Sequence, residues 1–167
     1  MNNYRLINAF LLLMAVVAIS FAFFYLQRHV GLFPCPLCIF QRIGIMVMGL
    51  FAFIALIINP SKFWARLMLW FGSVLGAMWT AGVAARHIWI QNLPPSQTPA
   101  CGPGLDYWVD TMPMFDVVKE VFSGSGECAS IEWTLLGMSI PMQTFLLSVF
   151  LILVHLVLLG KIIRDRG

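Results

Sequence analysis

Charged residues are scarce in this chain. Only 10% of its 167 residues are Asp, Glu, Lys or Arg, with seven acidic side chains against ten basic ones, whereas 60% are hydrophobic and the mean hydropathy is +0.89. So little charge excludes an ordinary soluble domain and indicates a membrane protein. The sequence also lacks an internal repeat, a low-complexity tract and a separate soluble stretch, so residues 1–167 predict a single integral membrane domain.

Four apolar runs with almost no charge are each long enough to cross a bilayer as a helix. They cover about residues 9–26, 40–58, 67–85 and 142–160. Backbone groups surrounded by lipid must hydrogen-bond within their own segment, which favours helices for such runs. The sequence therefore predicts an all-α, four-transmembrane-helix bundle with a short loop at about 27–38 and a long loop at about 91–140.

The first run has an alternative interpretation as a cleaved signal peptide. Arg5 precedes it, and Ala18-Ile19-Ser20 loosely resembles a cleavage site. The run continues without a break to Leu26, which suits a retained helix better than the short apolar core of a signal peptide. We therefore expect the segment to remain as the first membrane span.

The basic residues indicate which way the bundle faces, because Lys and Arg resist translocation. Six lie on the side of both termini and four on the other: Arg5, Lys62, Arg66, Lys161, Arg164 and Arg166 against Arg28, Arg42, Arg86 and Lys119. Six of the seven acidic residues lie in the long loop, which is therefore a distinct polar surface. We expect cytoplasmic termini, with both loops in the outer compartment, where disulfides persist.

The four cysteines form two pairs, Cys35 with Cys38 and Cys101 with Cys128, and each pair lies outside a membrane-spanning run. In a Cys-x-x-Cys pair, one thiolate can attack while the other stays close enough to resolve the mixed disulfide. This is the chemistry of dithiol exchange. Two such pairs on one face of a membrane predict a thiol–disulfide relay.

The first pair stands where the second helix begins. Proline is favourable at the first helical position, so we expect Cys35 at the N-cap, Pro36 at N1 and Cys38 in the first turn. The partial positive charge of a helix N-terminus favours a thiolate there. Arg42 lies on the same helical face, where its guanidinium can stabilise an anion. The alternative for Arg42 is a side chain that snorkels to lipid headgroups.

The long loop carries the second pair in segments rich in glycine. A Gly-Pro-Gly stretch follows Cys101, and a Ser-Gly-Ser-Gly stretch precedes Cys128. We expect both cysteines on mobile, accessible chain, joined by a disulfide that exchanges easily. Between them, residues 114–122 place apolar side chains at helical spacing opposite charged ones. This predicts an amphipathic helix on the membrane surface or, equally, a helix packed against the loop itself.

Ligand pairs for a metal ion are also scarce. Zinc sites usually need two close pairs of ligands, whereas Cys101 and Cys128 lie 27 positions apart and His29 and His87 form no second pair. We therefore expect no metal site.

Together these residues resemble the bacterial disulfide bond formation protein B (DsbB) family. The resemblance rests on Cys-Pro-Leu-Cys-Ile-Phe-Gln-Arg at 35–42, on His87 ahead of a proline-containing stretch and Cys101, and on Ser-Gly-Glu-Cys-Ala at 125–129. It extends over nearly the whole chain. Its most specific part is the Cys-x-x-Cys-x-x-x-Arg string combined with a second, widely spaced cysteine pair between the third and fourth spans.

The resemblance implies an enzyme of the bacterial inner membrane that reoxidises a periplasmic thioredoxin-fold dithiol oxidase, which is DsbA-like. It also implies that the electrons pass to a quinone, either ubiquinone or menaquinone. His87 resembles the histidine that lies near the quinone in this family, although a polar anchor at the membrane interface explains it equally well. We expect no nucleic-acid partner.

The resemblance further implies an order of electron transfer. Cys101 takes the mixed disulfide with the soluble partner, and Cys128 is released. Cys128 then exchanges with Cys35, which frees Cys38 as a thiolate beside Arg42 and the quinone.

Two other interpretations compete with this one. A vitamin K epoxide reductase-like protein is also a small helical bundle with two cysteine pairs, but its loop pair precedes the Cys-x-x-Cys, whereas here the Cys-x-x-Cys comes first. A non-enzymatic membrane protein with structural disulfides is the other. The span interiors contain almost no charge, which argues against a transport path in such a protein.

Overall fold

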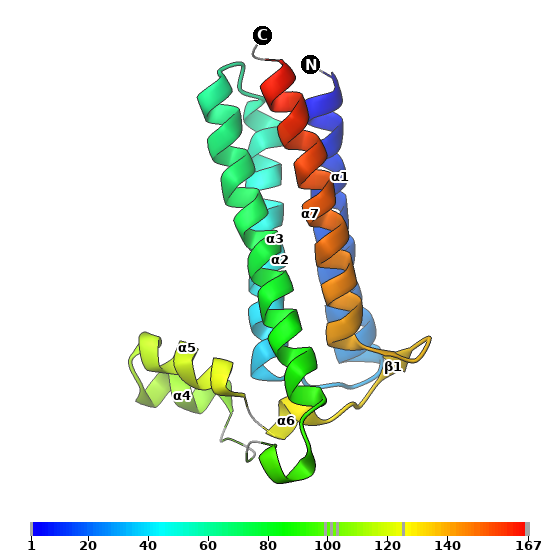
Figure 1. Cartoon of the computed structure of the whole chain (residues 1–167), viewed down its shortest axis with the longest axis vertical. Coiled ribbons are helices and arrows are strands. Elements are labelled where there is room, and N and C mark those ends of the chain that lie inside the picture. Colours follow the sequence, from blue (N-terminus) through cyan, green and yellow to red (C-terminus); the bar gives the residue numbers. More distant parts are fainter. Residues whose placement is uncertain (1, 99, 101, 103, 125, 166–167) are drawn as a thin grey trace.

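The structure is a computed structural model that describes residues 2–98, 100, 102, 104–124 and 126–165. Long helices dominate it, and short elements lie at one end of them (Figure 1). In chain order the elements are α1 (Asn2–Ser20), the π-helix η1 (Phe21–His29), α2 (Pro36–Ile58), α3 (Phe63–Gln91), the 3-10 helix η2 (Pro95–Gln97), α4 (Leu105–Thr111), α5 (Met114–Ser123), α6 (Gly126–Ala129), β1 (Thr134–Leu135), β2 (Met138–Ser139) and α7 (Ile140–Arg164).

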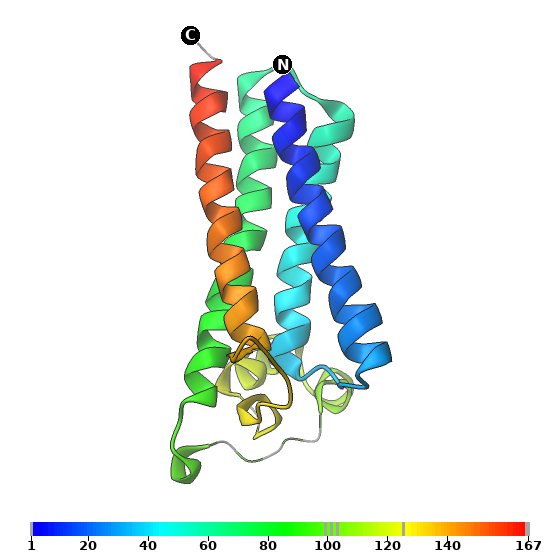
Figure 2. The same ribbon diagram turned by 90° about the vertical axis from the view of Figure 1, so that its right-hand side faces the viewer.

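The described residues form four helices that are long and apolar enough to cross a membrane, namely Asn3–His29, Pro36–Ile58, Phe63–Gln91 and Ile140–Arg164. This confirms the predicted all-α membrane bundle. Helix α2 packs against α1 and α3, and α3 packs against α7. Both termini lie at the end of the bundle that carries the α2–α3 connection, while the segment between α3 and α7 lies at the other end (Figures 1 and 2). The chain is a multi-pass membrane protein.

Helices α2 and α3 approach closely because small residues face each other at their contact. A Cβ atom on Gly44 would lie 2.8 Å from the Gly76 carbonyl oxygen, and one on Gly76 would lie 2.6 Å from the backbone nitrogen of Met48. Thr80 Oγ1 lies 2.9 Å from the Gly76 carbonyl oxygen and 3.3 Å from that of Gln41. Such close packing is how helices associate in lipid. It sets the register of α2 against α3.

We expect Gly76→Ala to destabilise the bundle by about 1–3 kcal/mol, the usual cost of overpacking a close contact. The added methyl group has no room, because backbone atoms of α2 stand 2.6 and 2.7 Å from its position and cannot rotate away. Gly82→Ala is the matched control on the same helix, since nothing lies within 4 Å of its Cβ position. Thermal unfolding in detergent should show a lower midpoint for Gly76→Ala alone. Equal midpoints would show that the close contact contributes nothing.

The segment that follows α3 folds over the ends of α2 and α3. Buried side chains of α4, α5 and α6 belong to one apolar cluster with the start of α2: Trp108, Val117, Val121 and Cys128 with Cys35. The first two residues of α5 are exposed instead. Helix α5 therefore has a face packed against the protein, while its location at a membrane surface stays a prediction.

Arg86 ties the end of α5 to α3. Its Nε donates to the Phe122 carbonyl oxygen at 2.9 Å and its Nη2 donates to that of Ser123 at 3.3 Å. The guanidinium also stacks on Trp89, 4.1 Å from the ring centroid. Basic side chains commonly satisfy the last carbonyl groups of a helix in this way. Because α6 follows α5 directly, this contact also holds α6 near α3.

A short β-hairpin, with two residues in each strand, precedes α7. The sequence patterns did not predict this hairpin. Strands β1 and β2 pair antiparallel, and Leu136 and Gly137 at the turn have positive φ values of 54° and 77°. Positive φ at both central residues is typical of the tight turns that suit hairpins. Ser139 Oγ then donates to Gln91 Oε1 at 2.8 Å, which joins the start of α7 to the end of α3.

Candidate functional site

Cys35 and Cys38 lie where α2 begins, at the end of the bundle that carries the short elements. Cys35 is the N-cap, with extended backbone at φ −65° and ψ 161°, and Pro36 follows as the first helical residue, as predicted. Both cysteines are unbridged thiols, and Cys35 Sγ donates to Cys38 Sγ at 3.1 Å. A contact this short lets side-chain rotation close the pair into a disulfide. The pair can therefore cycle between dithiol and disulfide on a fixed helix.

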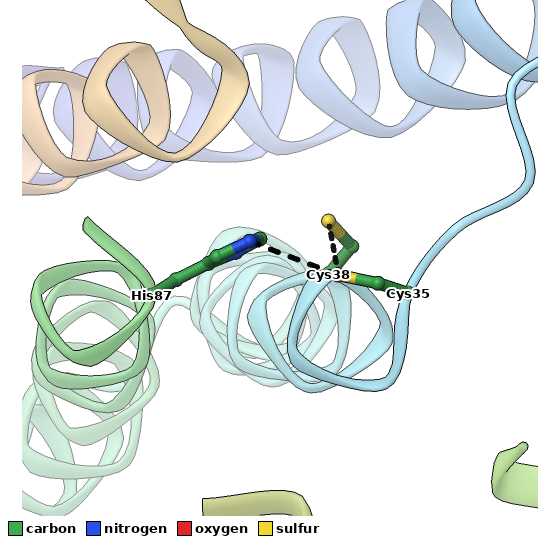
Figure 3. Close-up of side chains that lie close together, drawn as sticks. All are labelled: Cys35, Cys38 and His87. Carbon is green, nitrogen blue, oxygen red and sulfur yellow. Dashed lines mark hydrogen bonds between the residues drawn. The ribbon is translucent and has the colours of Figure 1, made fainter. Parts of the chain in front are cut away.

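His87 reaches this pair from one turn before the end of α3 (Figure 3). It is 3% exposed, and its Nε2 lies 3.9 Å from Cys35 Sγ. On the other side of the ring, Gln41 Nε2 lies 3.1 Å from His87 Nδ1. An amide nitrogen donates and does not accept, so this arrangement gives His87 its proton on Nε2. That N–H donates to the Cys128 carbonyl oxygen at 3.0 Å.

Cys128 lies on α6 and is 1% exposed. The prediction of a mobile, accessible segment is therefore wrong for this cysteine. It is buried because α6 packs against α3 and because His87 binds its carbonyl oxygen. A composition rich in glycine does not prevent the residues that follow it from packing against the protein. One residue of the second pair thus lies against the histidine that contacts the first pair.

Arg42 is held by the π-helical end of the first span. Its Nη1 donates to Gln27 Oε1 at 3.0 Å, and its Nη2 donates to the Ala22 carbonyl oxygen at 3.4 Å. A π-helix has wider turns, seen here in the bond from the Val30 N–H to the Tyr25 carbonyl oxygen at 2.9 Å, and such turns often mark functional sites. These contacts hold the Arg42 guanidinium against the first span.

A cavity of about 520 Å³ opens beside these side chains. One wall is lined by polar and sulfur-containing residues, which are Cys35, Cys38, Gln41, Arg42 and His87. Residues of the spans and of the long loop complete it. They include the apolar side chains of Ile19, Phe21, Ile45, Trp133, Ile140 and Leu147 and the polar ones of Gln91, Glu127, Ser130, Glu132, Gln143 and Thr144. Small-molecule sites commonly have about this volume, and their walls combine apolar side chains with polar groups. The cavity therefore suits a small molecule that has both apolar surface and polar groups.

The structure brings together most of the residues that the sequence singled out. Four line the cavity, namely Cys35, Cys38, Arg42 and His87, and His87 joins them to Cys128. Cys101, the sixth residue, lies outside the described residues.

Two glutamines of the site were missed. Gln41 follows Cys38 by three positions, which puts it on the same helical face, so helical spacing could have found it. Gln27 lies 15 positions before Arg42 on a different helix, and no spacing rule connects them. Each glutamine orients a residue that was predicted: Gln41 binds His87, and Gln27 binds Arg42.

Comparison with known proteins shows the family of this chain. The family described as Disulfide bond formation protein DsbB matches residues 4–158. Disulfide bond formation protein B of Psychrobacter arcticus is 57% identical over 164 residues, which are 98% of this chain and 93% of that protein. The proteins of the same name from Acinetobacter baumannii (49% over 154 residues, 92% and 90% of the two chains) and Chromobacterium violaceum (43% over 163 residues, 96% and 95%) are also similar.

The match extends over the first three spans, the cysteine pairs and most of α7. A disulfide-forming membrane oxidoreductase is what this family name describes, so the match decides against the vitamin K epoxide reductase-like and the non-enzymatic interpretations. The chain belongs to the DsbB family of disulfide bond formation proteins.

Proposed function

We propose that this protein is an inner-membrane thiol:quinone oxidoreductase that reoxidises a periplasmic, thioredoxin-fold dithiol oxidase (DsbA-like) and so sustains disulfide bond formation. The observation that carries this proposal is the double contact of His87. Its Nε2 lies 3.9 Å from Cys35 Sγ and 3.0 Å from the Cys128 carbonyl oxygen. A relay requires the two cysteine pairs to come together, and a single imidazole that contacts a residue of each pair supports that requirement.

The proposed relay consists of thiol–disulfide exchanges that conserve electrons. A partner thiolate attacks Cys101 of a Cys101–Cys128 disulfide, and Cys128 leaves as a thiolate. Cys128 attacks Cys35 of the Cys35–Cys38 disulfide and releases Cys38. The second partner thiolate then attacks the partner sulfur that is bonded to Cys101. This forms the disulfide of the oxidised partner and releases Cys101 as a thiolate. Cys101 finally attacks Cys128 and frees Cys35, so two electrons and two protons have passed to Cys35 and Cys38.

The cavity residues fit a quinone. When bound, a quinone supplies the acceptor for the two electrons of the Cys35–Cys38 dithiol. Arg42 provides a positive charge in the same wall as Cys38, where it can balance a thiolate. His87 lines the cavity, and its Nε2–H group donates to the Cys128 carbonyl oxygen in the long loop. Aromatic side chains in the wall, Phe21 and Trp133, exclude water and strengthen these charge interactions.

Turnover by the purified protein tests the function directly. Given the reduced partner and either ubiquinone or menaquinone in detergent, the protein should consume one quinone for each partner dithiol oxidised, as followed by quinone absorbance and thiol titration. The Cys101→Ser/Cys128→Ser double variant keeps Cys35 and Cys38 in the cavity wall and is the matched control, which should not turn the partner over. A folded protein that consumes neither quinone would overturn the proposal.

We also propose that the end of the bundle that carries Cys35, Cys38 and Cys128 faces the periplasm. Two exposed positions at opposite ends test this in a cysteine-free background: Thr111→Cys at the end of α4 and Ser61→Cys between α2 and α3. In cells with a permeabilised outer membrane, a membrane-impermeant maleimide should label Thr111→Cys. Ser61→Cys should react only after the inner membrane is broken. The reverse pattern would show the opposite orientation.

Arg42→Gln should lower kcat/KM for quinone by about 10- to 100-fold, because a hydrogen bond from a charged donor contributes roughly 1.5–3 kcal/mol. Single-turnover exchange between the partner and Cys101 should stay near normal, since Arg42 lies in the cavity wall. Arg42→Lys should retain part of the activity, because it keeps the charge but loses the planar donor pair. Arg28→Gln is the control, because Arg28 is exposed and stacks on Phe23. Equal effects of both Gln variants would make Arg42 a headgroup anchor.

A further inference from the structure

Three side chains with metal-binding atoms meet in the cavity wall. The Sγ atoms of Cys35 and Cys38 and a ring nitrogen of His87 all lie within 4.8 Å of one another (Figure 3). Thiolate and imidazole are the ligands that zinc prefers, and two cysteines with one histidine and an open fourth position form a known type of zinc site. The sequence shows no second pair of neighbouring ligands, but the fold supplies one histidine from 49 positions after Cys38.

The separations are close to those of a tetrahedral site. Bond lengths of about 2.3 Å to sulfur and 2.05 Å to nitrogen put two thiolates ~3.8 Å apart and a thiolate and an imidazole nitrogen ~3.6 Å apart. The Cys35 and Cys38 Sγ atoms lie 3.1 Å apart, and Cys35 Sγ lies 3.9 Å from His87 Nε2. Small rotations of the cysteine side chains within their rotamer wells change such distances by several tenths of an ångström. The cavity leaves room for water as the fourth ligand.

His87 can present Nε2 to a cation and keep its support from α2. The imidazole then carries its proton on Nδ1. The Nδ1–H group donates a hydrogen bond to Gln41 once the amide turns to put Oε1 in the place of Nε2, 3.1 Å away. A histidine that binds a metal ion through one ring nitrogen usually donates a hydrogen bond from the other. The Cys128 carbonyl oxygen loses its donor in the process. A cation and α6 therefore compete for the same nitrogen.

We propose that the reduced Cys35–Cys38 dithiol and His87 bind one thiophilic divalent cation such as Zn²⁺, and that this binding stops the relay. Two S–H bonds are replaced by two metal–sulfur bonds and two protons are released, with no change of oxidation state. The disulfide form offers no thiolate, so the site exists only while the pair is reduced. A bound cation keeps the electrons on the two sulfurs and removes His87 from Cys128. The effect on turnover rests on the proposed function, whereas binding does not.

Zinc stoichiometry tests the site without any enzymatic readout. The full chain with Cys101→Ser and Cys128→Ser, purified in detergent, keeps Cys35 and Cys38 as its only cysteines. After reduction and removal of the reductant without oxygen, titration against a chromogenic chelator should give one Zn²⁺ per chain and two protons released. Chains oxidised to the Cys35–Cys38 disulfide should bind none. Less than half an equivalent on the reduced, folded chain would overturn the proposal.

Variants of this chain test whether His87 is a ligand. His87→Leu should weaken Zn²⁺ binding by about 100-fold or more, whereas Gln41→Leu, which keeps all three donors, should weaken it by about 10-fold. His87→Cys supplies another soft donor at the same position and should recover binding, which separates a ligand from a structural role. His29→Leu is the control, because His29 stacks on Tyr25 and does not line the cavity. Equal zinc affinity in His87→Leu and the parent would overturn the proposal.

Protection of the thiols tests the block itself. Zn²⁺ should prevent the chemical oxidant diamide from closing the Cys35–Cys38 disulfide in the double variant, and a chelator should restore oxidation. In the unsubstituted protein, Zn²⁺ should inhibit partner-driven quinone reduction reversibly. Stoichiometric zinc with unhindered diamide oxidation would overturn the block. Zinc protection in a protein that never reduces quinone would uphold the metal site and reject the proposed function.

Discussion

Cys38→Ser is expected to abolish quinone reduction, with a loss on the order of 10³-fold or more, as is usual when a covalently acting residue is removed. A serine hydroxyl cannot form or break a bond to the Cys35 sulfur, which lies 3.1 Å from Cys38 Sγ in the parent protein. The pair can then no longer store two electrons as a dithiol. Steady-state quinone absorbance in the presence of excess reduced partner measures this loss.

The same variant should still complete the earlier exchange. The second cysteine pair is unchanged, so Cys38→Ser should release about one equivalent of oxidised partner in a single turnover and then stop. Quenched samples with alkylated thiols report this amount, and thermal unfolding confirms that the variant is folded. Continued oxidation of the partner beyond one equivalent would show that electrons leave by a route without Cys38.

Cys128→Ser should convert a transient complex into a stable one. The variant leaves Cys101 without its nearby resolving thiol, so a mixed disulfide with an oxidised partner should rise from trace amounts to most of the protein on a non-reducing gel. In the parent, Cys128 is 1% exposed, so we expect the soluble partner to attack Cys101 instead. Cys101→Ser is the matched control and should form no such adduct. An equal yield from both variants would reject the assignment.

Local rules predict the start of α2 from the sequence. Proline after Cys35 defines the N-cap, helical spacing places Cys38 and Arg42 on one face, and the cavity wall contains all three. The four spans follow from apolar length in the same way. In each case the deciding information lies in one continuous stretch of sequence: two helical turns at the start of α2, and about 20 apolar residues for each span.

Contacts between distant segments are not encoded in such spacing. His87 meets Gln41 because Gly44 and Gly76 let α2 and α3 pack closely, and only the register of that packing decides which side chains face each other. Cys128 is buried for a similar reason, since α6 docks on α3 after a glycine-rich stretch that looks mobile by composition. Amino-acid composition predicts the conformational freedom of an isolated segment, but it does not predict which part of the protein that segment packs against.

The cavity extends well below the first turns of the helices. Its lining on α7 runs from Ile140 to Leu147, and seven residues of helix correspond to ~10 Å. For the lipid-soluble acceptor proposed above, we expect exchange between the cavity and the hydrocarbon phase, so that the mole fraction of acceptor in lipid or detergent governs its occupancy. Doubling the detergent at a fixed total amount of a lipid-soluble acceptor halves that mole fraction and doubles a KM expressed in bulk units. Kinetic constants from differently solubilised preparations therefore become comparable after conversion to membrane concentration.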